Sequence, residues 1–247
     1  MRELSSSIEL VETLGEKTKR DMFALYSRYY GGTSEKLFNG DLADKAYVIL
    51  LRDTGGRLQG FSTLVVTEHC FEGAPIRTVY SGDTIVDERH WGQHALSFAW
   101  FRLAGAIKAA APPVPLYWFL TVKGHRTYRY LPAFFRVFYP AHDRSTPRRE
   151  RALMDMLARE RFGDAYDADT GLVRYPTSRG HLKSTWAEVP EKDRKRPDVL
   201  FFLERDPRYA EGDELVCLCE LTLENQKPLM RRLFRAGMED EDMKEKP

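Results

Sequence analysis

The chain has 247 residues, of which 43% are apolar, and its 14 Phe, 12 Tyr and 4 Trp suffice for the core of one large domain. Its formal net charge of +1 gives no overall reason to expect binding to nucleic acid or to an anionic membrane. No apolar run approaches the ~18–20 residues that cross a bilayer, and the N-terminal segment lacks the apolar block of a signal peptide. Because the three cysteines are an odd number, they do not form a disulfide framework, and we expect a soluble, cytoplasmic protein.

The first part of the chain predicts two helices and then a β meander. Apolar residues recur at helical spacing between charged ones in two stretches, and a glycine pair ends the first: residues 8–30 and 34–44. Three runs rich in β-branched and aromatic residues follow, separated by short turn sequences that contain glycine: residues 46–53, 58–70 and 76–88. Since the connections are short, these three strands are expected to form an antiparallel meander.

A helix, a buried strand and a further helix are predicted next. The first helix has an apolar face, and an Ala-Pro-Pro sequence ends it; the face comprises Leu96, Trp100, Leu103 and Ile107. Residues 114–122 are nearly all apolar, which suits a strand buried on both faces. Residues 125–140 predict another helix, which Pro132 would kink or restrict.

The second half of the sequence is less regular. Residues 145–163 predict a helix, because a Ser/Thr cap and a proline precede a long amphipathic run. Residues 164–198 are polar and interrupted by Pro and Gly, so an irregular segment is expected there. Two β-rich runs are expected to form a closing hairpin, residues 199–205 and 214–223, and the acidic segment 238–247 is expected to be disordered.

The junction between the third strand and the next helix has the sequence Arg89-His90-Trp91-Gly92-Gln93-His94. The first backbone N–H groups of a helix have no intrahelical partners, and the helix dipole places partial positive charge there. A diphosphate can accept several of those hydrogen bonds, Gly92 permits a close approach or a positive φ, and Arg89 can add a charge-assisted contact. The junction therefore predicts an anion site, and the alternative is an ordinary turn glycine.

The order of elements and this junction resemble the GCN5-related N-acetyltransferase (GNAT) superfamily. In that family two helices precede a three-strand meander, and the next helix holds the pyrophosphate of an acyl-CoA at an R/Q-x-x-G-x-G/A sequence. Arg89 and Gly92 match it, whereas His94 stands where Gly or Ala is usual. The resemblance implies an α/β (α+β) fold with a mixed, mostly antiparallel central sheet flanked by helices. It also implies a single domain over residues 1–237, with a helical insertion at 141–198 before the C-terminal hairpin.

The resemblance further implies a function and a site. An acyl group would pass from a thioester donor, an acyl-CoA or an acyl-carrier protein, to an amine by direct attack. The donor would be bound at the junction, by Val86, Arg89, Trp91, Gly92, Gln93, His94 and Ala95. Asp83 would serve as the base or as the anchor for the acceptor's ammonium, and Tyr130, in the fourth main helix, as the acid for the leaving thiolate.

Each catalytic candidate has a structural alternative. Asp83 lies mid-strand, where a carboxylate is costly unless it is paired or lines a cleft, but it could also face solvent or accommodate a backbone bulge. Glu68 and His69 end the preceding strand and could reach a cleft or be solvated. Tyr128 is a second candidate for the acid, and either tyrosine could belong to the core. His125 could cap its helix, contact a substrate or be exposed.

The remaining sequence features argue against several other chemistries. Cys217 and Cys219 share one strand face, but nothing nearby completes a zinc site, so no metal is expected and both fit buried small apolar residues. The basic run 192–197 could contact phosphates or an acidic carrier protein, or be a solvated loop. The sequence contains no P-loop, dinucleotide fingerprint, HExxH or GxSxG motif.

Three functions therefore remain in view. The first is an acyltransferase with a small-molecule amine as acceptor and an acyl-CoA or a carrier protein as donor, without nucleic acid or a membrane span. The second is a non-catalytic GNAT-like binding module, which the departure at His94 favours. The third is an interaction protein that would bury the 199–223 hairpin in a homodimer or a partner complex.

Overall fold

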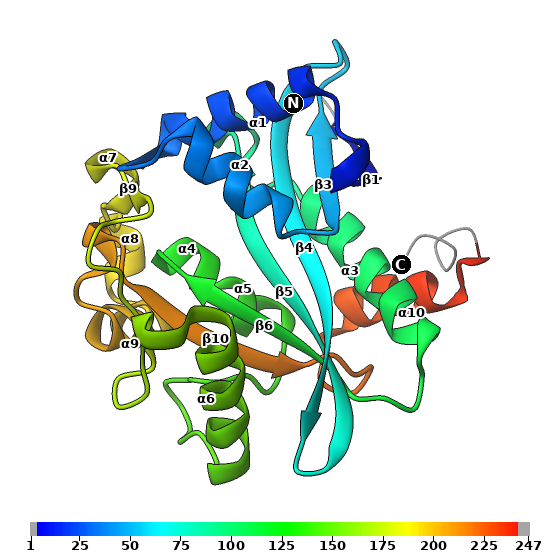
Figure 1. Cartoon of the computed structure of the whole chain (residues 1–247), viewed down its shortest axis with the longest axis vertical. Coiled ribbons are helices and arrows are strands. Elements are labelled where there is room, and N and C mark those ends of the chain that lie inside the picture. The colour runs from blue at the N-terminus through cyan, green and yellow to red at the C-terminus, as the bar shows by residue number, and fades with distance from the viewer. Residues whose placement is uncertain (1–3, 242–247) are drawn as a thin grey trace. The chain divides into compact units, whose positions relative to one another are not determined.

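The computed structural model describes residues 4–241 of the chain (Figure 1). It divides into two compact units, each of which is described by itself. Unit 1 comprises Met1–Arg28, Ser34–Tyr117 and Leu221–Pro247, and unit 2 comprises Tyr29–Thr33 and Trp118–Glu220. The single domain expected over residues 1–237 stays a prediction.

Unit 1 is built on four antiparallel strands that follow one another in the order β1-β3-β4-β5. Their bounds are β1 Ser5–Leu10, β3 Tyr47–Arg52, β4 Leu58–Phe71 and β5 Ala74–Val86. The predicted meander is confirmed, with short turns between β3 and β4 and between β4 and β5. Strand β3 forms because five of its six residues are buried, while β1 pairs along its whole length with β3 and leaves four of its six residues exposed.

The start of the first predicted helix was wrong. Residues 5–10 form strand β1, a short 3-10 helix η1 follows at Val11–Thr13, and helix α1 begins only at Glu16 and ends at Tyr29. Residues 5–10, Ser-Ser-Ser-Ile-Glu-Leu, contain too few apolar residues to distinguish the two periods, and pairing with β3 decides in favour of the strand. The other predicted helices of this unit are confirmed as α2 Glu35–Ala43 and α3 Ala95–Ala110.

A helix near the end of the chain was not predicted. Helix α10, Pro228–Glu239, packs against α3 at a point where both helices carry a glycine. A side chain at Gly105 would collide with the backbone carbonyl of Phe234, and one at Gly237 with that of Arg102. The helix continues into the segment expected to be disordered, where Asp240 pairs with Arg102 at 2.7 Å. Residues 242–247 lie outside the described part of the chain.

Unit 2 contains four strands in the order β6-β10-β8-β7. Their bounds are β6 Leu116–Val122, β10 Glu214–Glu220, β8 Leu172–Val173 and β7 Tyr166–Asp167. The buried strand predicted at 114–122 is confirmed by β6. A separate two-stranded sheet pairs β2, Tyr30–Gly31, with β9, His181–Leu182, so the connection between α1 and α2 lies beside the segment before α7.

The predicted closing hairpin was wrong. Residues 197–205 form helix α9, Pro197–Arg205, with Pro197 in its first turn and Val199 and Phe202 buried three residues apart. A short apolar run has no period that separates strand from helix, and the proline start and the burial on one face select the helix. Strand β10, predicted at 214–223, is confirmed. Its neighbours in the sheet are β6 and β8, and not the run 199–205.

The helix expected over residues 125–140 is two short helices. These are α4 His125–Tyr128 and α5 Tyr130–Phe134, and the chain is irregular from Phe135. The break agrees with Pro132, which has no N–H to donate and fits only an early helical turn. The long helix predicted at 145–163 is confirmed as α6 Arg148–Phe162. The region 164–198, expected to be irregular, holds the two-residue strands β7, β8 and β9 and the one-turn helices α7 Ser184–Ala187 and α8 Glu191–Arg194.

The predicted fold class, α/β with a mostly antiparallel sheet flanked by helices, is confirmed. The order of elements from α1 to α5 is also the predicted one: two helices, a meander, a helix, a strand and a helical segment. Among the described residues, none of the helices has the length and apolar composition needed to cross a membrane.

Candidate functional site

A β-bulge places Asp83 at an irregular point of strand β5. Ser62 pairs with Thr84 and Leu64 with Ser81, so Thr63 faces two residues, Gly82 and Asp83. Such a bulge bends a strand and redirects its side chains. The bulge that the sequence left open as an alternative is therefore present, and Asp83 is half-buried beside it.

A buried lysine explains why the bulge requires a glycine. A side chain at Gly82 would come within 2.5 Å of Lys45 Cε and 2.6 Å of Thr63 Oγ1. The Lys45 side chain has no exposed surface, and its Nζ donates at 2.8 Å both to the backbone oxygen and to a carboxylate oxygen of Asp41. Sequence analysis missed Lys45, because only the folded sheet brings the end of α2 against β5.

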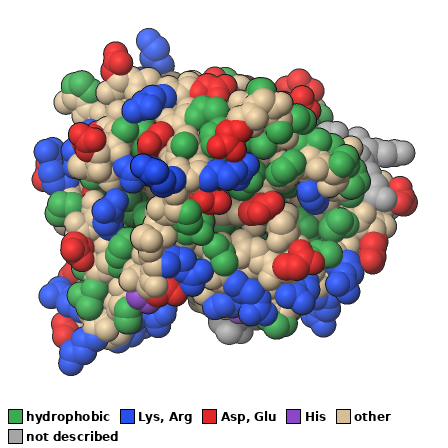
Figure 2. Space-filling model, turned by 90° about the horizontal axis from the view of Figure 1, so that it is seen from below, with side chains coloured by type: hydrophobic (Ala, Val, Ile, Leu, Met, Phe, Trp, Pro, Cys, Tyr) green, Lys and Arg blue, Asp and Glu red, His purple; other side chains and the backbone are tan. Residues whose placement is uncertain are grey.

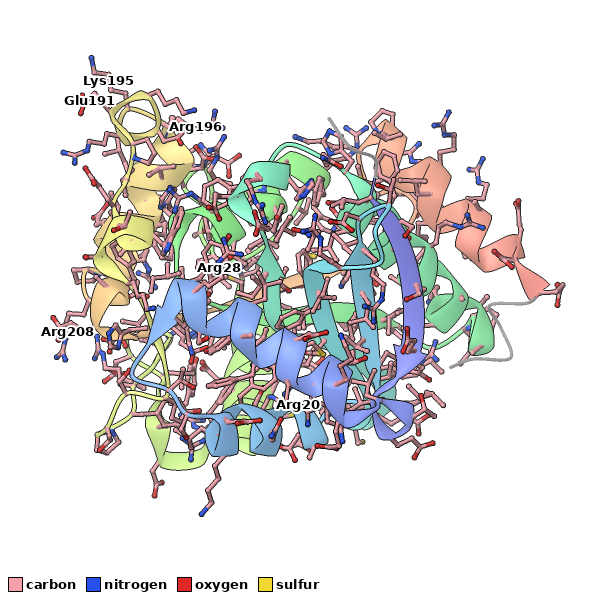
Figure 3. The ribbon with its side chains drawn as sticks, turned by 90° about the horizontal axis from the view of Figure 1, so that it is seen from above. Arg20, Arg28, Glu191, Lys195, Arg196 and Arg208 are labelled. Carbon is pink, nitrogen blue, oxygen red and sulfur yellow. The ribbon has the colours of Figure 1, made fainter. Side chains whose placement is uncertain are left out.

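Asp87 holds the junction that follows β5 together. Its carboxylate is fully buried, and it accepts hydrogen bonds from Arg28 Nη1 at 2.6 Å and Arg89 Nε at 2.8 Å. The backbone N–H of Arg89 donates to it as well, at 3.1 Å. These donors, the Arg89 side chain foremost, hold the pKa of Asp87 far below its usual range. Figure 3 shows Arg28 at the end of α1, whose side chain thus joins this helix to the junction.

Several polar side chains of the junction form hydrogen bonds with other residues of the junction. Arg89, expected to contact a phosphate, is directed to Asp87, and its Nη2 lies 3.3 Å from Gln59 Oε1. The indole of Trp91 donates to the backbone oxygen of Val86 at 2.8 Å. The side chain of Gln93 lies 3.0 Å from His90 Nδ1. These side chains define the shape of the loop.

The backbone of the junction has the features expected of an anion site. Gly92 has φ +87°, a conformation that favours glycine, and no atom of the described residues lies within 4 Å of where its Cβ would be. Helix α3 begins at Ala95, and in the described part of the chain no side chain caps it; its N-cap residue, His94, stacks instead on Phe98 at 5.7 Å. The N–H groups of the first turn and the positive end of the helix dipole are therefore available to an anion.

The two candidate tyrosines of unit 2 differ in their surroundings. Tyr128 is fully buried and donates its hydroxyl hydrogen to the backbone oxygen of Pro140 at 2.9 Å, which is a structural role. Tyr130 is half-buried and stacks on Phe134, with ring centroids 5.5 Å apart. Burial raises the pKa of Tyr130 above that of an ordinary tyrosine, whose hydroxyl is already protonated at neutral pH, and this hydroxyl can donate a proton.

The candidates His125, His69 and Glu68 differ in burial and in hydrogen bonding. His125 is buried, and burial, followed by the charge of Arg126, lowers its pKa to about 4, so the ring is neutral at physiological pH. Among residues 4–241 its Nε2 has no hydrogen-bond partner. His69 lies 3.0 Å from Thr78 Oγ1 on the neighbouring strand, whereas Glu68 is exposed.

Sequence analysis also missed a carboxylate of unit 2 that is largely buried. Glu214, the first residue of β10, accepts a hydrogen bond from Thr121 Oγ1 at 2.5 Å and pairs with Lys123 Nζ at 3.3 Å. The same ammonium lies 5.9 Å from the centre of the Tyr30 ring. A cation held between a carboxylate and an aromatic ring is the arrangement by which proteins bind amines. No local sequence signal joins these residues, which come from three separate segments.

The remaining candidates, two cysteines and the basic run 192–197, lie in surroundings that indicate structural roles. Cys217 and Cys219 are buried, which raises the pKa of both thiols, and within the described residues no group of His, Cys, Asp and Glu side chains could hold a metal ion. The basic run carries Lys195 and Arg196 on the surface, as Figure 3 shows, and is fixed by buried Asp193, which pairs with Arg129 at 3.0 Å. Figure 2 shows acidic and basic side chains interspersed on the face seen from below.

The comparisons with known proteins give structural likenesses only. No family model matches the chain, and no curated protein matches it. A conserved protein of unknown function from Enterococcus faecalis V583, described as a probable N-acyltransferase, is 13% identical with a TM-score of 0.39 over 54% of this chain. This chain covers 33% of that protein's length.

Two further solved structures match about half of this chain. The GNAT-family N-acetyltransferase YhbS from Escherichia coli, in complex with CoA, is 16% identical with a TM-score of 0.37 and is covered over 71% of its length. The toxin AtaT, bound to acetyl-CoA and the C-terminus of the antitoxin AtaR, is 12% identical with a TM-score of 0.36 and is covered over 86%. Both matches cover 55% of this chain. The solved structures to which this chain is similar thus include GNAT-family N-acetyltransferases.

Proposed function

We propose that this chain is a divergent GNAT-type acyltransferase, which moves an acyl group from a thioester donor to an amine. The observation that carries the proposal is the end of β5. There a bulge at Gly82 and Asp83 is followed by a loop with Gly92 at φ +87° and by the uncapped start of α3. Backbone donors at a helix start suit the diphosphate of a coenzyme A, because they offer several hydrogen bonds and partial positive charge.

In this proposal the junction binds the donor mainly through its backbone. Val86, Trp91 and Gln93 shape the loop, Gly92 allows close approach, and the first-turn N–H groups of α3, which begins at Ala95, donate to the diphosphate. Arg89 contributes by fixing the loop on Asp87 and by leaving positive charge nearby. His94 adds bulk where the family has Gly or Ala, which favours a donor pocket that differs from a standard acetyl-CoA site.

The acyl transfer itself requires two proton movements. The acceptor ammonium must lose a proton before its nitrogen can attack the thioester carbonyl, and the leaving thiolate must gain one. Asp83, half-buried at the bulge, is the proposed base or ammonium anchor, and Tyr130, protonated at neutral pH, is the proposed acid. The attack is direct, so no bond forms between the acyl group and these two residues during transfer to an amine.

Calorimetry with acetyl-CoA, a long-chain acyl-CoA and free CoA tests the donor site. Gly92→Pro should abolish binding, because proline fixes φ near −65° and cannot adopt +87°. Gly40→Ala is the matched control, since Gly40 lies in α2 with open space around it among the described residues, and it should bind as the wild type does. Failure of the wild type to bind any of the three would contradict an acyl-CoA donor, and unchanged binding by Gly92→Pro would contradict the placement of the donor at this junction.

A carrier protein is the second donor that the test must include. An acyl-carrier protein presents the same pantetheine arm without the adenosine and its 3′-phosphate, so binding of this donor with no binding of CoA would assign the chain to carrier-dependent transfer. Loss of product with Asp83→Asn and Tyr130→Phe, at unchanged donor affinity, would support their roles in the transfer step.

The alternative is a GNAT-like module that binds without catalysis. The internal hydrogen bonds of Arg89, Trp91 and Gln93 favour it, because each of these side chains already has a partner in the loop. It predicts CoA binding with no consumption of acetyl-CoA across a panel of amines. The acyltransferase predicts consumption that depends on the amine.

A further inference from the structure

Lys45 lies under the β-bulge of unit 1, and the proposed function gives it no role. It follows helix α2, and its side chain has no exposed surface. A buried ammonium is costly without partners, and Asp41 supplies two: its carboxylate and its backbone oxygen both accept from Lys45 Nζ at 2.8 Å. The centre of the Tyr80 ring of β5 lies 5.8 Å from the same nitrogen. Each of these groups attracts a positive charge, so the fold holds a cation at a fixed place beside the bulge.

Ser81 and Thr84, the residues on either side of the bulge, lie on the face of the sheet that helix α3 covers. Trp100 of α3 donates its indole hydrogen to Ser81 Oγ at 3.2 Å. Ser81 pairs with Leu64, and Thr84 pairs with Ser62, whose hydroxyl lies 2.8 Å from its own. Because Ser62 and Leu64 are two residues apart on β4, they share one face, and so do their partners on β5.

The bulge turns both of its residues, Gly82 and Asp83, away from α3 and toward Lys45. Each is next to a residue of the α3 face, and successive residues of a strand face opposite sides. A side chain at Gly82 would come 2.5 Å from Lys45 Cε and 3.4 Å from its Nζ. Since successive Cα atoms are about 3.8 Å apart, the ammonium lies within about 9 Å of the Asp83 Cα. Asp83 therefore shares a face, and a short distance, with a fixed positive charge.

The stem of Lys45 also supports the shape of the bulge. It fills the space that a side chain at position 82 would occupy. Across the bulge, the Thr63 hydroxyl is buried and has no hydrogen-bond partner among the described residues, so it does not hold the bulge by a polar contact. The backbone that carries Asp83 thus rests on the lysine stem.

We propose that Lys45 is a positioning residue of the transfer site, which holds Asp83 in place through the bulge and keeps its carboxylate ionised. The proposal rests on the acyltransferase function proposed above, and it selects one of the two roles left open for Asp83. A carboxylate near a positive charge retains its own charge and is a weaker base, so Asp83 anchors the acceptor's ammonium and does not remove its proton. Asp41 offsets the charge of Lys45, so the three side chains together carry one negative charge, which attracts an amine that arrives as its cation.

Two substitutions separate the charge of Lys45 from its stem. Lys45→Met keeps the stem and removes the charge, and carbon-13 NMR should then show the Asp83 carboxylate titrating about one pH unit higher than in the wild type. Asp83→Asn identifies the signal. With acetyl-CoA and a panel of amines, the low-pH side of the transfer profile should move in the same direction, through a higher KM for the amine at an unchanged kcat. Lys45→Ala removes the stem as well and should lower kcat by about 10-fold or more, because the bulge loses its support.

Lys17→Met is the matched control. Lys17 also pairs with an aspartate four residues away, Asp21, but at the surface of α1, with 83% of its side chain exposed. The control removes an ion pair of the same spacing that is far from any bulge contact, and it should match the wild type in both the titration and the transfer profile.

Several results would overturn the proposal. An unchanged titration of Asp83 in Lys45→Met would do so, and so would an unchanged KM for the amine or a fall in kcat alone. Calorimetry with acetyl-CoA shows whether the donor site is intact, which we expect because Asp87 holds the junction. If a thermal melt shows that Lys45→Met is unfolded, Lys45→Gln, which can still donate to Asp41, takes its place. A wild type that consumes acetyl-CoA with none of the amines would refute the acyltransferase, and the titration would still decide whether the charge of Lys45 acts on Asp83.

Discussion

Asp206 provides the sharpest test of the structure through the dependence of stability on pH. It follows helix α9 and is completely buried. Within residues 4–241 neither of its carboxylate oxygens accepts a well-formed hydrogen bond, although the backbone N–H of Arg208 approaches the carboxylate and lowers its pKa. Burial, followed by the charge of Asp213, raises its pKa to about 7. Asp213 is itself paired with Arg174 at 2.8 Å, and the charge of Arg174 only partly offsets the effect of burial on Asp206.

The sign of the effect follows from which state binds the proton more tightly. In the unfolded chain Asp206 has a pKa of 3.8, so between pH 4 and 7 the folded state holds a proton that the unfolded state has lost. Stability therefore falls as the pH rises through this window and becomes constant above it. Each pH unit corresponds to about 1.4 kcal/mol, so the carboxylate costs about 4 kcal/mol at pH 8.

The perturbation is Asp206→Asn, which keeps the shape of the protonated side chain and removes its titration. We expect the variant to equal the wild type near pH 4 and to be more stable by up to about 4 kcal/mol at pH 8. Urea unfolding at a series of pH values measures this difference. Glu204→Gln, an exposed residue of the same helix, is the control and should follow the wild type. Parallel curves for Asp206→Asn and the wild type would refute the reasoning.

Three further predictions concern stability. Gly105→Ala should destabilise the chain by at least about 1–3 kcal/mol, because its Cβ meets backbone of α10, whereas Gly40→Ala, in open space within a helix, should stabilise by up to about 1 kcal/mol; thermal melts compare the two. As the pH falls from 6.5 to 4 the wild type should lose about 3 kcal/mol of stability, because the folded state keeps His125 neutral down to about pH 4; His125→Gln should not show this loss, and urea midpoints compare the two. Tyr128→Phe should cost about 1 kcal/mol of unfolding free energy in the same assay, the value of its hydrogen bond to Pro140.

The elements that could be predicted are those whose evidence is local. The meander, α3 and α6 each combine a pattern of apolar residues with turn, cap or end signals, and β6 is a nearly continuous apolar run. Such signals reflect which backbone conformation buries apolar side chains on one face. These signals are reliable where a segment is long enough for the helical and the strand period to be distinguished.

The elements that were wrong or missed depend on distant contacts. Residues 5–10 are a strand because β3 offers them an edge, and 199–205 are a helix because one face of that run is buried. Helix α10 was missed although its sequence is amphipathic, since the charges after it suggested disorder. Its position is fixed by glycine contacts with α3, more than a hundred residues earlier in the chain.

The candidate site likewise has features that are visible in the local sequence and features that depend on distant contacts. The sequence by itself indicated the junction around Gly92 and the carboxylate in the strand before it as candidates, because helix-start chemistry and a charge inside a strand can be recognised locally. Only the tertiary structure decided the partners: Arg28 and Arg89 on Asp87, Lys45 beneath the bulge, and Lys123 on Glu214. The physical reason is that a buried charge is stable only with a partner, and the partner is chosen by which segments the fold brings together.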